Sequence, residues 1–317
     1  MSVEQSVIDL AKAIAKAGGR ALLVGGYVRD HALARESKDY DFEVYGLTLN
    51  ELENTLAEFG EVIAVGRAFG VLRVKGLEMD FSLPRRDNKT GKGHRGFVVD
   101  LAPSLSFPEA AKRRDLTINS MGLDPLTGEL IDPYDGRADL EAGILRATDA
   151  EQFSEDPLRG LRVAQFAARF AMQPDDELIA ICRELDLSEL PAERLCGEFE
   201  KLLLKGEKPS VGLKFLENTG LLRFFPELDA LRGVPQDPRW HPEGDVWVHT
   251  CMCLDEAAKL RTGDAFEDEA LMFATLCHDL GKPETTTTDQ TGRVRAIQHE
   301  KAGIEPTRRF AEQLKLG

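Results

Sequence analysis

Two aspartates spaced two residues apart, Asp39 and Asp41, follow the glycine pair Gly25-Gly26. Side chains two residues apart on a β-strand point to the same face, so the two carboxylates lie side by side. They repel each other unless a cation joins them, and carboxylate oxygens suit a hard divalent ion. The alternative is a polar strand edge in a hairpin. The spacing favours a metal site beside a triphosphate, which predicts nucleotidyl transfer.

Further residues near this pair suit phosphate and ribose groups. The glycines let backbone N–H groups approach phosphate oxygens. Arg29 is interpreted either as a phosphate ligand or as the structural partner of a carboxylate. Asp80 lies in a strand pattern that ends at Pro84, and it is either a third carboxylate or an exposed strand acid. The basic segment 112–114, followed by Asp115, suits a triphosphate and a ribose hydroxyl, or begins a helix with Asp115 as N-cap.

A possible base reader follows at Asp156 and Arg159, which are three residues apart and would share a helix face. Together they offer an acceptor beside a two-pronged donor. Cytosine and adenine present an amine next to a ring nitrogen, whereas uracil and guanine present a carbonyl and an N–H. The pair would therefore accept C and A without a template. The alternative is a plain helix start, with Asp156 as N-cap before Pro157.

A third group of residues suits a different metal. His249, the adjacent His278-Asp279, and His299 offer nitrogen and oxygen ligands for a divalent ion. A single histidine would more often be structural, but three in this arrangement favour a metal site.

The densest basic segment runs from Arg85 to Arg95, and it is either a solvated loop or a substrate contact. Its candidate RNA-binding side chains are Arg85, Arg86, Lys89, Lys92 and Arg95.

Composition narrows the class of protein. A net charge of −15 argues against indiscriminate nucleic-acid binding, but it permits an RNA-handling enzyme with a local basic surface. No apolar run approaches the length of a bilayer span, and the N-terminus lacks a signal-peptide pattern, so we expect a cytoplasmic protein without membrane contact. The five cysteines include no C-x-x-C pair, and we expect ordinary thiols, Cys251-x-Cys253 included.

Hydrophobic periodicity divides the chain into a mixed α/β part and a helical part. From about Glu151 the strand signals fade, helical spacing continues through 155–225, and helices return at 246–282 after a Pro-rich linker. An N-terminal helix is also expected. Strands are predicted at Ala21–Val24, Phe42–Tyr45, Val62–Val65, Gly70–Val74, Glu78–Leu83 and Phe97–Leu101.

These motifs resemble those of the class II tRNA nucleotidyltransferases, which are the CCA-adding enzymes and their bacterial poly(A) polymerase relatives. The resemblance is nearly continuous from Leu22 to about Leu204, and the region after Trp240 resembles an HD-type metal-dependent phosphohydrolase domain. The motifs that carry it are GGYVRD with DYD, RRDLTINSM, DPYDGRADL, EDPLRGLR and ERLCGEFEKLL.

The family implies an α+β chain: a DNA polymerase β-like nucleotidyltransferase head with a mixed sheet (1–145), an all-α neck (146–233) and a partial all-α HD domain (240–317). Asp39 and Asp41 would hold two Mg²⁺ ions, and a second divalent metal would occupy the HD site. Segment 132–139 would be the hinge that switches the pocket between C and A, and 85–95 a flexible loop needed for that switch. The implied nucleotide-binding residues are Gly25, Gly26, Arg29, Arg113, Arg114, Asp115, Asn119, Asp156, Arg159 and Arg162.

Two departures from the family pattern matter. Position 165 is Gln165, where many relatives carry another arginine, so the resemblance does not extend to one expected contact with nucleotide or RNA. The chain ends at Gly317, 18 residues after His299, before the final HD aspartate is expected. We therefore expect an incomplete HD domain.

The resemblance implies addition of CCA to tRNA from CTP and ATP, by two-metal attack of the RNA 3′-OH on the α-phosphate. A poly(A) polymerase, or an enzyme that adds only CC or only A, remains an alternative. Other classes are an HD-domain phosphodiesterase or phosphatase, and an inactive RNA-binding relative. The sequence leaves the oligomeric state open.

Overall fold

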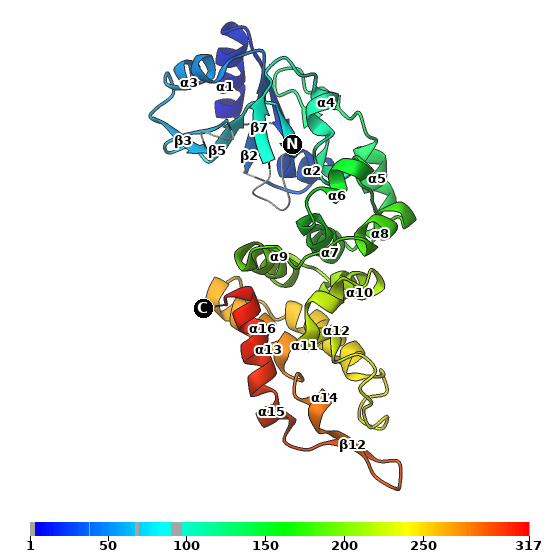
Figure 1. The fold of residues 1–317 in the computed structure, drawn as a ribbon. Helices are drawn as coiled ribbons and strands as arrows, with labels where there is room; N and C mark the ends of the chain where they lie inside the picture. The colour runs from blue at the N-terminus through cyan, green and yellow to red at the C-terminus, as the bar shows by residue number, and fades with distance from the viewer. Residues whose placement is uncertain (1–3, 38, 67–69, 90–96, 317) are drawn as a thin grey trace. The chain divides into compact units, whose positions relative to one another are not determined.

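The structure, a computed structural model, describes residues 4–37, 39–66, 70–89 and 97–316, with side chains 87–89 and 97–99 outside the description. The chain forms two compact units, Met1–Asp156 and Pro157–Gly317 (Figure 1). The three domains expected above remain a prediction.

The first unit is built on a seven-stranded mixed sheet with the order β3-β4-β5-β2-β1-β8-β9. β2 pairs in parallel with β5, and β1 pairs antiparallel with both β2 and β8. The strands of this unit are β1 (Arg20–Val24), β2 (Tyr40–Tyr45), β3 (Val62–Gly66), β4 (Val71–Val74), β5 (Met79–Ser82), β6 (Arg85–Lys89), β7 (Phe97–Leu101), β8 (Gly122–Leu123), β9 (Leu130–Ile131) and β10 (Ile144–Leu145).

Helices lie against this sheet. α1 packs on β1 and α3, and buries an apolar stripe that recurs at helical spacing. α3 begins with a capping box in which Thr48 and Glu51 satisfy each other's backbone N–H groups. The helices are α1 (Gln5–Lys16), α2 (Gly26–Ala32), α3 (Leu49–Leu56), α4 (Phe107–Ala111), the 3-10 helix η2 (Thr117–Asn119), α5 (Gly136–Ala142) and α6 (Ala150–Ser154).

The alternation of β2 separates core from chemistry. Tyr40, Phe42 and Val44 are buried on one face, where Phe42 stacks on Phe81 of β5 with ring centroids 4.9 Å apart. The opposite face carries Asp41, Glu43 and Tyr45, because successive strand residues alternate. On that side α4 packs on β1 through Phe107 and Ala111, which contact Leu22 and Val24.

The second unit is helical. α7 packs against α9 and α10, and α12 against α13, with large apolar side chains such as Phe199 and Trp247 buried. Its elements are α7 (Leu158–Phe170), β11 (Gln173–Pro174), α8 (Asp176–Arg183), α9 (Ala192–Lys205), α10 (Pro209–Asn218), η3 (Leu221–Phe224), α11 (Pro226–Asp229), α12 (Val246–Ala258), α13 (Ala265–Cys277), α14 (Lys282–Thr285), β12 (Thr286–Thr288), β13 (Val294–Ala296), α15 (His299–Ala302) and α16 (Ile304–Leu314).

The α+β head followed by helices confirms the predicted fold class, and all six predicted strands are present. The expectation that 85–95 is a loop is wrong for its first part, because Arg85–Lys89 is β6 and pairs with β7. Among the described residues, no helix has both the length and the apolar character needed to cross a bilayer.

Candidate active site and candidate metal site

Three carboxylates lie together at one end of β2 and β5. Asp41 is the direct register partner of Asp80, and Asp39 lies just before the first residue of β2. All three line a hollow of about 460 Å³. Asp39 and Asp41 are exposed there, so the predicted pair does face a space that a ligand can enter.

The charge at this hollow favours a cation. Partial burial raises the pKa of Asp41, and the negative charges of Asp80 and Asp39 raise it further. The positive charges of Arg114 and Arg73 offset this repulsion only in part, because the pKa of Asp41 stays above its ordinary value. Adjacent carboxylate oxygens are what a hard divalent ion requires, so these residues fit the expected metal.

Asp80 differs from the other two because it already has a partner. Arg73 of β4 donates to both of its oxygens, with Nε–Oδ1 at 2.6 Å and Nη2–Oδ2 at 2.8 Å. The prediction that Asp80 lies beside the pair on the adjacent strand is confirmed by the register. Whether it also binds metal remains a prediction.

The turn between β1 and α2 brings Gly25 to the same place. Gly25 has φ 67° and ψ −131°, which is strained for a residue with a Cβ. A Cβ there would lie 3.6 Å from both Arg114 Nη1 and Asp41 Oδ2. Gly25, Asp41 and Arg114 are therefore neighbours, although they are far apart in sequence.

Glu43 holds two of the predicted phosphate-binding arginines. Its carboxylate is fully buried, with Arg113 Nη2 at 3.1 Å and Arg114 Nη2 at 3.5 Å. Tyr45 donates its hydroxyl to Glu43 Oε2 at 2.8 Å. Burial alone would raise the pKa of Glu43, but the charges of Arg114 and Arg113 outweigh it and lower the pKa. Glu43 is thus ionised and fixes a positive surface beside Asp41.

Arg29 takes the structural role that the sequence left open. It is buried, donates Nε and Nη2 to Asp30 Oδ1 at 3.0 and 2.8 Å, and donates Nη1 to Asn119 Oδ1 at 2.8 Å. Asn119 in turn donates to Asp115 Oδ1 at 3.0 Å. Asp115 is not the N-cap of the following 3-10 helix, which is Leu116. These residues form one buried network below the glycine turn, and their contact with nucleotide remains a prediction.

Two other predicted segments have mainly local contacts. In the predicted hinge, Asp132 accepts from the backbone N–H of Gly136 at 2.8 Å, and Asp139 accepts from Thr117 Oγ1 at 2.7 Å. In the basic segment, Arg85 is partly buried and Arg86 is exposed. The side chain of Lys89, and Lys92 and Arg95 entirely, lie outside the described residues.

The predicted base readers are divided by the unit boundary. Asp156 ends the first unit, and it is not the N-cap of α7, which is Pro157. Asp156 therefore precedes the helix, which begins at Leu158, and its pairing with Arg159 remains a prediction. Arg159 and Arg162 lie in α7, where Arg162 is 5.5 Å from the Phe166 ring centroid.

The second unit brings the three predicted histidines around the fourth predicted residue, the buried carboxylate of Asp279. Nε2 of His278 lies 3.2 Å and Nε2 of His249 lies 3.9 Å from Asp279 Oδ2, and Nε2 of His299 lies 3.6 Å from Oδ1. Lys282 Nζ is 2.7 Å from Oδ2. Although burial alone would raise it, hydrogen bonds from His278 and Lys282 lower the pKa of Asp279 to about 2, so it is ionised at neutral pH.

Hydrogen bonds fix which nitrogen of each histidine is available. Nδ1 of His278 lies 2.7 Å from the Thr275 carbonyl, and Nδ1 of His299 lies 2.9 Å from the Ala296 carbonyl. Carbonyl oxygens only accept, so Nδ1 carries a proton in both rings, and Nε2 is the nitrogen that faces Asp279.

His249 is oriented in the same way by Glu243, whose Oε1 lies 2.7 Å from Nδ1. A bond from its own backbone N–H, together with bonds from His241 and His249, lowers the pKa of Glu243 to about 2. Protonated Nδ1 held by a carboxylate or carbonyl is the usual support of metal-bound histidine.

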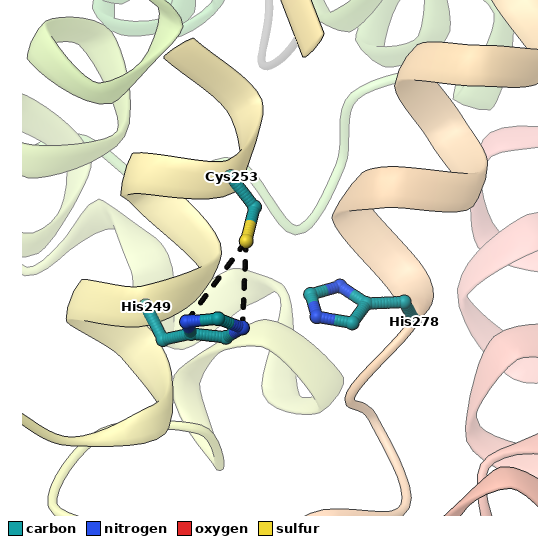
Figure 2. Close-up of side chains that lie close together, drawn as sticks. All are labelled: His249, Cys253 and His278. Atoms are coloured by element: carbon teal, nitrogen blue, oxygen red, sulfur yellow. Dashed lines mark hydrogen bonds between the residues drawn. The ribbon is translucent and has the colours of Figure 1, made fainter. Parts of the chain in front are cut away.

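Figure 2 shows His249 and Cys253 on α12, facing His278 at the end of α13. Cys253 Sγ lies 3.4 Å from His249 Nε2. One ligand atom from each of the three residues lies within 4.8 Å of the others.

Sequence reasoning missed Glu43, Arg73, Glu243 and Cys253. Glu43 continues the alternation of Asp39 and Asp41, and that signal was available. Cys253 follows His249 by four residues on a helix, which places both on one face. The roles of Arg73 and Glu243 come from tertiary contacts, which a local sequence pattern does not predict.

Comparison with known proteins gives a consistent assignment. Residues 21–146 match the family described as "Poly A polymerase head domain", and residues 177–232 match "Probable RNA and SrmB- binding site of polymerase A". The chain is 41% identical over 302 residues to a "Multifunctional CCA protein" of Stenotrophomonas maltophilia (strain K279a), covering 93% of this chain and 71% of that protein. A protein of the same name from Pasteurella multocida (strain Pm70) is 39% identical over 305 residues, covering 93% of this chain and 69% of the relative.

Solved structures share the fold. "The complex structure of CCA-adding enzyme with ATP" superposes with a TM-score of 0.64 at 19% identity, covering 99% of this chain and 68% of that one. "tRNA-processing enzyme (apo form 2)" gives 0.61 at 22% identity, covering 97% and 77%.

The head fold with its carboxylate pair is that of a nucleotidyltransferase, a class that uses divalent metal ions. The chain belongs to the family of CCA-adding tRNA nucleotidyltransferases and bacterial poly(A) polymerases. The predicted family is thereby confirmed, whereas the HD assignment of the second unit remains a prediction.

Proposed function

We propose that the protein adds CCA to the 3′ end of tRNA from CTP and ATP, without a template. The observation that carries this proposal is the exposed Asp39–Asp41 pair beside Gly25 and the Glu43-held arginines. The "Multifunctional CCA protein" relatives, alike over 93% of this chain, favour CCA over the other products of the family.

In the reaction, the RNA 3′-OH attacks the α-phosphorus in line, and the bond to the bridging oxygen breaks to release pyrophosphate. Two Mg²⁺ ions, when bound, would lower the pKa of the hydroxyl and neutralise the departing charge. Asp39 and Asp41 would hold these ions. Arg114 and Arg113, oriented by Glu43, would bind the triphosphate, while Gly25 leaves room for it. Catalysis is then mainly positioning and charge neutralisation.

Alanine at Asp39 or Asp41 tests the catalytic assignment. Loss of a metal ligand removes several kcal/mol of transition-state stabilisation, so CTP and ATP incorporation should fall by roughly 1,000-fold or more. Thermal unfolding should show an intact fold, because removal of one carboxylate relieves repulsion. Substantial incorporation by either variant would contradict the assignment.

Base choice is assigned to Asp156, Arg159 and Arg162, a proposal supported by the EDPLRGLR motif. Arg159→Ala should relax nucleotide choice. Discrimination against UTP that is unchanged in this variant would count against the role.

A metal-dependent phosphohydrolase is a second candidate function, favoured by the three histidine Nε2 atoms around Asp279 in the second unit. Cleavage of a 2′,3′-cyclic nucleotide by the metal-loaded protein, lost in His278→Ala, would support it. The protein's cytoplasmic location remains a prediction.

A further inference from the structure

Cys253 lies in the histidine cluster, although the sequence analysis interpreted it as an ordinary thiol. It follows His249 by four residues in α12, so both side chains leave the same face of the helix (Figure 2). Its Sγ is 3.4 Å from His249 Nε2, on the side of the ring that Glu243 leaves available.

The distance between Cys253 Sγ and His249 Nε2 matches the distance between two ligands of one metal ion. With Zn–S of about 2.3 Å and Zn–N of about 2.0–2.1 Å, tetrahedral geometry puts the sulfur and nitrogen roughly 3.5 Å apart. His278 completes a set of three whose ligand atoms all lie within 4.8 Å of one another. Neither Asp279 nor His299 is part of that set, although Asp279 Oδ2 lies 3.2 Å from His278 Nε2. His299 faces the other oxygen of Asp279, at 3.6 Å.

We propose that the second unit binds a thiophilic divalent ion of the zinc class through His249 Nε2, Cys253 Sγ and His278 Nε2, with the Asp279 carboxylate beside them. Binding releases the thiol proton, because the thiolate is the ligand. Lys282, 2.7 Å from Asp279 Oδ2, orients the carboxylate from outside the ligand set. His299 and the other oxygen of Asp279 then remain available on one side of the ion.

The thiolate decides the choice of metal. Soft sulfur ligands select zinc-class ions, whereas a purely nitrogen and oxygen set accommodates harder ions as well. The inference concerns ion binding alone, so it stands or falls independently of nucleotidyl transfer in the first unit and of hydrolysis in the second.

Cobalt substitution tests the proposal without an activity assay. The full chain is stripped with a chelator and titrated with Co²⁺, which gives a thiolate-to-metal charge-transfer absorption in the near ultraviolet only if sulfur binds. We expect the band in the unmodified protein and in the control Cys196→Ala, which alters a partly buried cysteine of α9. It should be absent in Cys253→Ala and in Cys253→Ser, with circular dichroism confirming that both fold.

Competition with Zn²⁺ measures how much Cys253 contributes to metal affinity. Loss of groups that merely support ligands already costs about 10- to 100-fold in metal affinity, so Cys253→Ala should weaken Zn²⁺ binding by at least that much. Cobalt binding without the band, unchanged Zn²⁺ affinity in Cys253→Ala, or no binding at all would each overturn the proposal.

Discussion

Glu43 sets the electrostatics of the nucleotide site from below its surface. A buried carboxylate is costly unless it is paired, and here Arg113, Arg114 and Tyr45 all interact with it. In return, the two guanidinium groups are fixed beside Asp41 before any nucleotide arrives. Because Glu43 is fully buried behind the two arginines, we assign it as a positioning residue.

Replacing Glu43 with glutamine keeps the shape and removes the charge. We expect the free energy of unfolding to fall by about 1–3 kcal/mol, as for a buried hydrogen bond to a charged group. The KM for CTP should rise by about tenfold, which corresponds to ~1.4 kcal/mol of lost arginine placement. Chemical denaturation measures the free energy of unfolding, and steady-state kinetics measure the KM. The control is Glu58→Gln, which lies at an exposed position of the same unit. Wild-type values in Glu43→Gln would refute the role.

The stabilisation that Glu43 provides should depend on pH, and Glu43→Gln tests the direction of that dependence. Because the pKa of Glu43 is lowered in the folded protein, its stabilisation is complete above the unfolded value of about 4.3 and disappears as pH falls through the folded value. The stability difference between wild type and Glu43→Gln should therefore shrink below about pH 4. A difference that grows on acidification would contradict the ion pairs.

Local spacing predicted the carboxylates of this site but not the contacts of its arginines. Asp39 and Asp41 follow from strand alternation alone. The sequence left the roles of Arg29 and Asp115 open, and the structure joins both in a buried network through Asn119, which is 90 residues from Arg29. No pattern within a short window specifies such a contact.

Among the elements, the turn from β1 into α2 positions the backbone of the site. Gly25 adopts a positive φ of 67° here, with Asp41 and Arg114 on either side. A side chain at Gly25 would meet no severe clash, since its Cβ would lie 3.6 Å from its nearest neighbours. The cost of substitution is therefore backbone strain, and any relaxation of that strain moves the turn.

Gly25→Ala should cost of order 1–3 kcal/mol of stability and also reduce kcat/KM for CTP. Gly128→Ala is the matched control, because Gly128 has φ 74° and a Cβ there would meet nothing within 4 Å. The control should lose comparable stability and retain full incorporation. Equal losses of activity in the two variants would show that the turn has no special role.

The strands show where sequence patterns succeed and where they fail. Six strands were predicted because apolar or β-branched residues alternate between turn signals. β6, with the sequence Arg-Arg-Asp-Asn-Lys, carries no such pattern and is a strand because β7 supplies its hydrogen-bond partners. The two-residue strands β8, β9 and β10 are too short to leave a periodic signal.

At the scale of the whole molecule, chemistry is divided between two units. The first contains the carboxylate pair and the arginines, and the second contains the histidine cluster and the helices that match an RNA-binding family. The sequence predicted this order correctly, because the change from period-two to helical spacing near residue 151 is a global feature. It predicted the histidines around Asp279 but not Glu243, which contacts His249 from a loop.

The most direct measurement of the central claim is extension of tRNA that lacks its CCA end, with each nucleotide supplied separately and then together. CTP alone should add two residues, ATP alone should add one residue only to tRNA already ending in CC, and the mixture should give a discrete CCA product. Asp41→Ala should add none. Long A tails from ATP alone, or a product that stops at CC in the mixture, would contradict the account.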